Sequence, residues 1–372
     1  MIRPMKKITP LLIVTVLGLF SFITPSALAQ KRQITDDNGV ADIKADSEHA
    51  DVNAQGEITD VKSDGENRDV KDDKDDNEVA VGRKVQCLRT IYGIDGQRNP
   101  SLKEGLPKGI ALDADGKLFA IFLERTEIQV FSPQGDFLYR FGKKGTEPGA
   151  FLLPISIEVA DDGTVLVLDP ELKKVLAFSN RGRFQYEFSF AGAKSPDDKK
   201  PVRCIKMGHR NNVLYLSDSA NANIKLFNLK GDFLGIFPVK REKTKYLSVP
   251  GKTSFDSKGR IYIIDSLNGW VQVYDDKKEL LFSFGEIGDR LGNFVRPVAV
   301  SVNSTGNIYV LDRVLSVIQI FNPEGKVVGV IKDTDIPEGL NSTEPFDMTM
   351  DRQGVIYVSL QGLHCIKVLK DE

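Results

Sequence analysis

The chain has 372 residues, with 50 Lys and Arg against 52 Asp and Glu, and a formal net charge of −2. This balance excludes the strongly basic field of a dedicated nucleic-acid-binding protein. No segment after residue 29 contains 18 continuous apolar residues, so the sequence predicts no transmembrane span once the N-terminal segment is removed.

Residues 1–29 have the pattern of a secretory signal peptide. Three basic residues precede an apolar run of 13 residues at 11–23, and a small-x-small cleavage site ends at Ala29. Because the run is short for a membrane span, we favour cleavage before Gln30 over an uncleaved anchor. The sequence therefore predicts an exported protein, either periplasmic or extracellular.

Residues 30–80 differ in composition from the rest of the chain. They contain 16 Asp and Glu against 7 Lys and Arg and almost no large apolar residues. Such a segment buries too little surface to offset its ordering entropy, so we expect a disordered acidic linker. The alternative, an interaction tail or calcium-attracting segment at 72–78, lacks the glycine and spacing of a calcium loop. Residues 81–372 carry 40 basic and 36 acidic residues, a net charge of +4.

Six repeats occupy the remainder of the chain. Their turn residues lie 47, 49, 47, 47 and 48 residues apart, at Gly116, Gly163, Asn212, Gly259, Gly306 and Gly354. Such a regular period indicates an array of one supersecondary unit. Each repeat starts near a proline, at Pro107, Pro154, Pro201, Pro250, Pro297 and Pro345.

Each repeat contains four short strand signals, which we call a to d in chain order. They are rich in β-branched and aromatic residues and are separated by Asp-Gly and similar turns, which are typical of hairpins. One four-stranded sheet of this size must stack against its copies to bury both faces. The sequence therefore predicts an all-β fold: a six-bladed β-propeller of four-stranded antiparallel blades over residues 81–372.

The sixth repeat ends after its third strand. The segment at 85–93, VQCLRTIYG, matches the fourth strands of other repeats, such as DFLYRFG. We therefore expect this N-terminal segment to join the last blade and close the ring.

The chain has three cysteines, Cys87, Cys204 and Cys365. An exported protein can oxidise a pair, and Cys87 and Cys365 are expected on neighbouring strands. Our register places Cys365 opposite Ile91, too far from Cys87 for a disulfide. We expect no structural disulfide, and we interpret Cys204 and Cys365 as small core residues.

The linkers FGKKGTEPGAFLLP and FGEIGDRLGNFVRP, followed by the pattern P-x-x-I-x-V-x-x-x-G-x-I-Y-V-x-D, resemble those of NHL-repeat propellers. The resemblance covers residues 85–372 and implies a six-bladed platform that binds proteins or, in some members, RNA. Blades one and six depart from the pattern, because Phe122 and Leu360 stand where the other blades have Asp.

Some members of this kind resemble zinc-dependent lyases that use several histidines. Only His49, His209 and His364 occur here, in the acidic linker, in an expected a–b turn and near the b–c loop of blade six. They cannot meet at one site, so a three-histidine zinc site is not expected.

The d–a and b–c loops share one face of a propeller, and we expect function there. The loops that enter blades three and four carry seven basic residues. On the same face we expect Tyr246 and the single tryptophan, Trp270, in the b–c loop of blade four. The basic residues are Lys194, Lys199, Lys200, Lys240, Arg241, Lys243 and Lys245.

Strand a differs between the blades at the position two residues after the repeat proline. Three blades have the small residues Gly109, Ser156 and Ala299, and three have the charged residues Arg203, Lys252 and Asp347. With the loop residue Arg296, Arg203 and Lys252 are expected to form a cationic pocket for a carboxylate or phosphate. The alternative is internal pairing with Asp347 or with Glu158, two positions further along strand a, which would only fill the channel.

The recurring aspartates after strand b have a structural interpretation, because an Asp that leaves a strand can cap the next turn. These residues are Asp169, Asp218, Asp265 and Asp312.

We predict a monomeric, non-catalytic binding propeller that recognises a protein or peptide, with no nucleic acid partner and no required cofactor. The alternative is a metal-dependent hydrolase or lyase of the cell envelope, with a divalent cation in the central channel.

Overall fold

The computed structural model describes residues 82–93, 105–237, 247–336 and 344–372. The expected signal peptide and acidic linker lie outside these ranges, and so do the candidate residues Lys240, Arg241, Lys243, Lys245 and Tyr246. Across the described ranges, no helix has the length and apolar character needed to cross a membrane.

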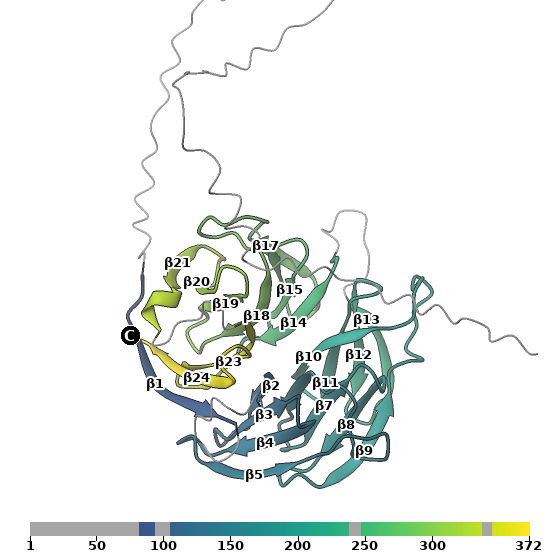
Figure 1. The fold of residues 1–372 in the computed structure, drawn as a ribbon. Coiled ribbons are helices and arrows are strands. Elements are labelled where there is room, and N and C mark those ends of the chain that lie inside the picture. The colour runs from purple at the N-terminus through teal and green to yellow at the C-terminus, as the bar shows by residue number, and fades with distance from the viewer. Residues whose placement is uncertain (1–81, 94–104, 238–246, 337–343) are drawn as a thin grey trace, which may run out of the picture. The chain divides into compact units, whose positions relative to one another are not determined.

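Six four-stranded antiparallel sheets form the described part of the chain, as the repeats predict (Figure 1). A short 3-10 helix, η2 (Asp333–Asp335), follows the last strand of blade five. The strands of blades one to three are β2 (Pro107–Leu112), β3 (Leu118–Phe122), β4 (Glu127–Phe131), β5 (Phe137–Phe141), β6 (Ser156–Val159), β7 (Val165–Asp169), β8 (Lys174–Phe178), β9 (Phe184–Ser189), β10 (Cys204–Arg210), β11 (Val213–Asp218), β12 (Asn223–Asn228) and β13 (Phe233–Phe237). Those of blades four to six are β14 (Pro250–Phe255), β15 (Ile261–Asp265), β16 (Trp270–Tyr274), β17 (Leu280–Phe284), β18 (Pro297–Val302), β19 (Ile308–Asp312), β20 (Val317–Phe321), β21 (Val327–Ile331), β22 (Pro345–Met350), β23 (Val355–Leu360), β24 (Cys365–Asp371) and β1 (Val85–Tyr92).

The blades form a closed ring around a central channel. Each innermost strand contacts the innermost strands of the two adjacent blades, in the order β2, β6, β10, β14, β18 and β22, and β22 contacts β2. The second and third strands of each blade are almost entirely buried, because both of their faces pack against neighbouring blades.

Strand β1 closes the ring. It pairs antiparallel with β24 in the sheet order β1-β24-β23-β22, so the last blade takes its fourth strand from the N-terminal side of the propeller. This confirms the closure predicted from the missing strand. Figure 1 shows β1 along the outer side of β24.

The β1–β24 register differs by one residue from our expectation. Cys365 lies opposite Tyr92, and Cys87 lies opposite Leu369. The bulge between Cys87 and Arg89 produces such a shift, because it inserts an extra residue on one side of the ladder. All three cysteines are free thiols.

The hydrophobic core lies between adjacent blades. Phe151 and Phe294, the phenylalanines of the two linker motifs, are fully buried. Their rings lie 5.5 Å from Phe178 and 5.6 Å from Phe321, respectively. Each linker therefore places an aromatic side chain in the interface that it spans, which explains the Gly-x-Phe spacing before the repeat proline.

Candidate functional site

The recurring aspartates bind backbone amides from two segments. The Asp169 carboxylate accepts hydrogen bonds from Leu152 N and Leu153 N at 2.7 and 2.9 Å, and from Glu171 N and Leu172 N at 3.0 Å. Asp312 repeats this arrangement with two amides of the incoming linker and two of the b–c turn. The carboxylate therefore fastens the linker to the turn and supplies acceptors that two irregular segments would otherwise lack.

Blade three adds a buried ammonium group to this arrangement. The Lys225 Nζ of β12 pairs with Asp198 in the preceding linker and lies 3.6 Å from Asp218 Oδ2. All three side chains are almost completely buried, and the paired lysine holds the pKa of Asp198 below its usual value against the effect of burial. Our sequence reasoning did not identify Lys225, because a lysine within a strand gives no sign of its partner.

The charged position on the channel wall differs from our expectation in blade three. The residue that pairs with the next-to-last residue of strand b is Ala299 in blade five, Asp347 in blade six and Lys206 in blade three. Lys206 therefore occupies the position that the sequence assigned to Arg203. Arg203 precedes β10, and its side chain is exposed.

The position of the repeat proline in blade three causes this difference. This proline, Pro201, lies three residues before the first residue of β10, whereas Pro250, Pro297 and Pro345 each begin their strand. Blade three also differs in its a–b hairpin, a two-residue turn in which Asn211 and Asn212 have φ of 48° and 60°. Two consecutive residues with positive φ are typical of a type I′ turn, so His209 lies within β10 rather than in a turn.

Lys252, Lys206 and Asp347 meet inside the channel. The Lys252 Nζ lies 2.9 Å from Asp347 Oδ1 and donates to Met348 O at 2.9 Å. The Lys206 Nζ lies 3.9 Å from Asp347 Oδ2 and donates to Phe346 O at 3.4 Å. Strands β10 and β14 thus reach across the channel to β22. Lys252 is therefore paired inside the channel, as the alternative interpretation of the sequence proposed. Arg203 is exposed and takes no part in this pairing.

The pKa values of this cluster follow from burial and mutual charge. Burial raises the pKa of Glu158 to about 7; Asp347 adds to the rise, and Lys252 and Lys206 oppose it. Burial lowers the pKa of Lys206 to about 8, with Lys252 and Lys108 in the same direction and Asp347 opposed. Burial also disfavours charged Asp347, but the two lysines outweigh it and hold its pKa below the usual value.

The remaining predicted site residues lie on the loop-rich face. Arg296 is exposed at the end of the linker into blade five. Trp270 is half-buried and is the first residue of β16, opposite Asp265, rather than a residue of the b–c loop.

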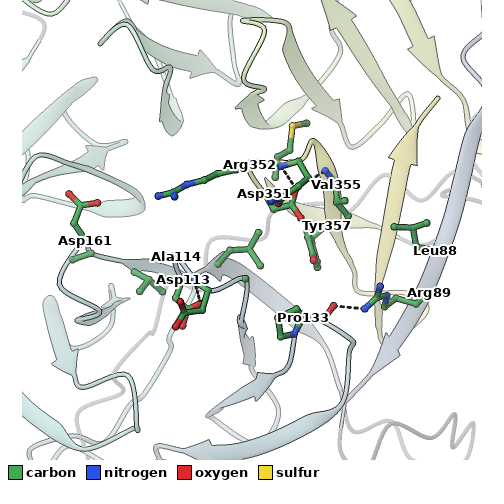
Figure 2. Close-up of a pocket in the computed structure, with 17 residues that line it drawn as sticks. Leu88, Arg89, Asp113, Ala114, Pro133, Asp161, Asp351, Arg352, Val355 and Tyr357 are labelled. Atoms are coloured by element: carbon green, nitrogen blue, oxygen red, sulfur yellow. Dashed lines mark hydrogen bonds between the residues drawn. The ribbon is translucent and has the colours of Figure 1, made fainter.

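A cavity of about 560 Å³ opens on the opposite face, where the a–b turns of blades one, two and six meet (Figure 2). Leu88, Val355 and Tyr357 contribute to its apolar lining. Its charged lining residues are Asp113, Asp115, Asp161, Asp351, Arg89 and Arg352. Asp113 and Asp351 accept from amides of their own turns, and Arg89 donates to Pro133 O. Asp113, Asp351 and Arg89 thus organise the turns around the cavity.

Within the described part of the chain, no group of three or more His, Cys, Asp or Glu side chains is arranged to hold a metal ion. Inside the channel, Asp347 and Glu158 face Lys206 and Lys252, so ammonium groups take the place next to the carboxylates that a cation would take.

Comparison with known proteins gives the fold. No family model and no curated protein matches the chain. Among solved structures, virginiamycin B lyase from Staphylococcus aureus is 13% identical with a TM-score of 0.51, over 77% of this chain and 99% of that one. A protein of unknown function from Bacteroides thetaiotaomicron is 15% identical with a TM-score of 0.57, over 79% and 75% of the two chains. The WD40 propeller domain of Doa1 is 12% identical with a TM-score of 0.51, over 77% and 97%.

These neighbours include a lyase and a WD40 domain, so the shared architecture does not choose between catalysis and binding. Together with the six sheets and their closure by β1, the comparisons establish that the chain forms a six-bladed β-propeller.

Proposed function

We propose that this protein is a non-catalytic NHL-type propeller that binds a protein or peptide through the face formed by its d–a and b–c loops. The observation that carries the proposal is the distribution of exposed apolar side chains. Of twelve large exposed ones among the described residues, six lie on fourth strands, and the other six all lie on d–a or b–c loops: Leu153, Leu267, Ile287, Leu291, Val295 and Val314.

Five of these six loop residues belong to blades four and five. Ile287, Leu267 and Val314 are 67%, 60% and 56% exposed, so packing within the fold does not account for apolar residues at these positions. Their loops are joined, because Ser266 Oγ donates to Pro297 O at 2.8 Å and Arg313 N donates to Arg296 O at 3.0 Å. A neighbouring set of exposed apolar loop residues is typical of a protein–protein contact surface.

Two arginines adjoin this apolar set. Arg296 is exposed and follows Val295 directly, and Arg313 precedes Val314. Arginine is enriched in interfaces because its planar group pairs with carboxylates and still covers apolar surface. The partner we propose therefore presents apolar side chains together with an acidic group.

The test is capture of a partner by the purified propeller. Wild-type protein and the Leu267→Asp/Val314→Asp variant would be used as bait with envelope extracts, and bound proteins would be quantified by mass spectrometry. The matched control is Leu234→Asp, because Leu234 is 53% exposed but lies on the fourth strand of blade three.

The proposal requires a protein that wild type and the Leu234→Asp control both retain and that the loop variant loses. Retention of the same proteins by all three baits would overturn it. Stoichiometric calcium or zinc in the purified protein, with a melting temperature that a chelator lowers, would instead favour the metal-dependent hydrolase or lyase.

We also propose that the propeller works outside the cytoplasm, with residues 30–80 as a spacer. The signal-peptide pattern supports this location, and the predicted mature chain begins at Gln30. N-terminal sequencing of the protein from fractionated cells tests it, and an intact Met1 in a cytoplasmic fraction would contradict it.

A further inference from the structure

Two ammonium groups from different blades lie close to the aromatic ring of Phe346. Phe346 is the second residue of β22 and is half-buried. The Nζ atoms of Lys108 and Lys206 lie 4.4 and 4.2 Å from its ring centroid. The two nitrogens are therefore at most 8.6 Å apart, although Lys108 belongs to β2 and Lys206 to β10.

Lys206 is underbonded for a buried cation. Its side chain is nearly enclosed, at 9% exposure for the residue. An ammonium has three N–H donors, yet the acceptors around the Lys206 Nζ lie at the long distances of 3.4 Å for Phe346 O and 3.9 Å for Asp347 Oδ2. Asp347 is shared with other donors, because Oδ1 accepts from Lys252 and Met348 N at 2.9 Å and Oδ2 accepts from Ile110 N at 3.3 Å.

Positive charge is in excess around this ring. Lys252 and Lys108 both lower the pKa of Lys206. The carboxylates near it are Asp347, which two of the lysines share, and Glu158, whose raised pKa of about 7 leaves it partly protonated near neutral pH. Burial lowers the pKa of Lys108, and repulsion from Arg313 lowers it further against the attraction of Glu344. Arg313 and Glu344 belong to the loop-rich face and pair with each other at 2.8 Å, so Lys108 lies at the loop-rich end of the channel.

We infer that the channel mouth beside Phe346, between Lys108 and Lys206, binds an oxyanion, and that this oxyanion is a carboxylate of the partner peptide. A carboxylate that accepts one hydrogen bond of about 2.8 Å at each oxygen bridges ammonium nitrogens up to roughly 8 Å apart, so it can reach both lysines where they lie on one side of the ring. The Phe346 ring adds an apolar wall, which suits a carboxylate attached to carbon better than a free inorganic anion.

The inference rests on the proposed function for the source of the carboxylate, but small anions test the site without any partner. Acetate and inorganic phosphate would be titrated at constant ionic strength, with chloride as reference. The melting temperature and the 13C signals of the lysine Cε groups would be followed. The variants are Lys108→Gln and Lys206→Gln, and the control is Lys258→Gln, an exposed lysine in an a–b turn on the opposite face.

We expect acetate to bind saturably to wild type and to the Lys258→Gln control, and to raise the pKa of Lys206. Loss of one charge-assisted hydrogen bond should weaken acetate binding about tenfold or more in either channel variant. Lys108→Gln is the decisive variant, because it leaves the Lys252–Asp347 and Lys206–Asp347 contacts in place. Equal acetate responses in all four proteins, or no saturable response, would overturn the site.

A response to phosphate without one to acetate would overturn the assignment to a carboxylate. Failure of this inference differs from failure of the proposed function. In the first case the loop variant still loses the partner while acetate does not bind. In the second, acetate binds and the channel variants lose it, but no bait captures a partner that depends on the loop residues.

Discussion

Burial in the channel moves the Glu158 carboxyl into the range of neutral pH. It shares the channel with Lys206, Lys252 and Asp347, and its pKa of about 7 lies well above its usual value of 4.5. A raised acid pKa means that folding favours the protonated form, so ionisation opposes the folded state. Full stability from this residue is therefore present below about pH 4.5 and is lost as the pH rises through about 7.

Glu158→Gln should remove this pH dependence, because the amide resembles the protonated acid. We expect the variant to gain stability over wild type between about pH 4.5 and pH 7, by up to about 1.4 kcal/mol per pH unit. Urea unfolding at several pH values measures the difference. A difference that is the same at both ends of this window would contradict the prediction.

The charged residues of the channel could be predicted only in part from the sequence. Lys252, Asp347 and Glu158 were identified because their repeats carry charge where other repeats carry small residues. Lys206 was missed, because the proline of blade three lies three residues before its strand. Counting from the proline therefore selected Arg203. The partners of Lys206 come from a strand more than a hundred residues away, which no local pattern reveals.

At the scale of the element, β1 is the strand on which the last blade depends. It pairs with β24 from Val85↔Asp371 to Tyr92↔Cys365 and covers an edge that would otherwise be open. Ile91 is buried against Tyr357 and Ile366, so β1 also contributes to the core between blades six and one.

The order and number of strands could be predicted, because turn chemistry and alternation recur six times. The bulge in β1 could not, because backbone register depends on the partner strand.

Deletion of residues 81–93 should lower the melting temperature strongly, because it exposes the edge of β24 and removes Ile91 from the core. Deletion of residues 30–80 serves as the control and should leave the melting temperature nearly unchanged. Thermal unfolding followed by circular dichroism compares the two proteins. Equal melting temperatures would show that β1 does not hold the ring closed.

At the scale of the whole molecule, ion pairs tie blades that are not neighbours. Lys252 of blade four and Lys206 of blade three both reach Asp347 of blade six, and Asp347 accepts from Ile110 N of blade one. A ring that is held only by contacts between adjacent blades can open through the loss of one interface. The contacts across the channel link blades on opposite sides of the ring, and all of them involve Asp347.

Lys252→Met should destabilise the protein by about 3 kcal/mol, because it leaves Asp347 buried with a weaker partner. The double variant Lys252→Met/Asp347→Leu should recover part of this loss, with a coupling energy of about 1–3 kcal/mol in urea unfolding. The exposed pair Arg313–Glu344 gives the matched cycle and should couple by less than about 1 kcal/mol. Similar coupling energies in the two cycles would refute a special role for the channel pair.

Val85 and Asp371 lie directly opposite each other in the β1–β24 pair, so the two ends of the propeller lie side by side (Figure 1). The ring of blades is therefore continuous, and the fold does not require the two chain ends to lie in blade six. A short peptide that joined these ends would allow circular permutants that start in a turn of another blade. Such a permutant would make blade six from one continuous stretch of sequence and another blade from two, with the same set of contacts.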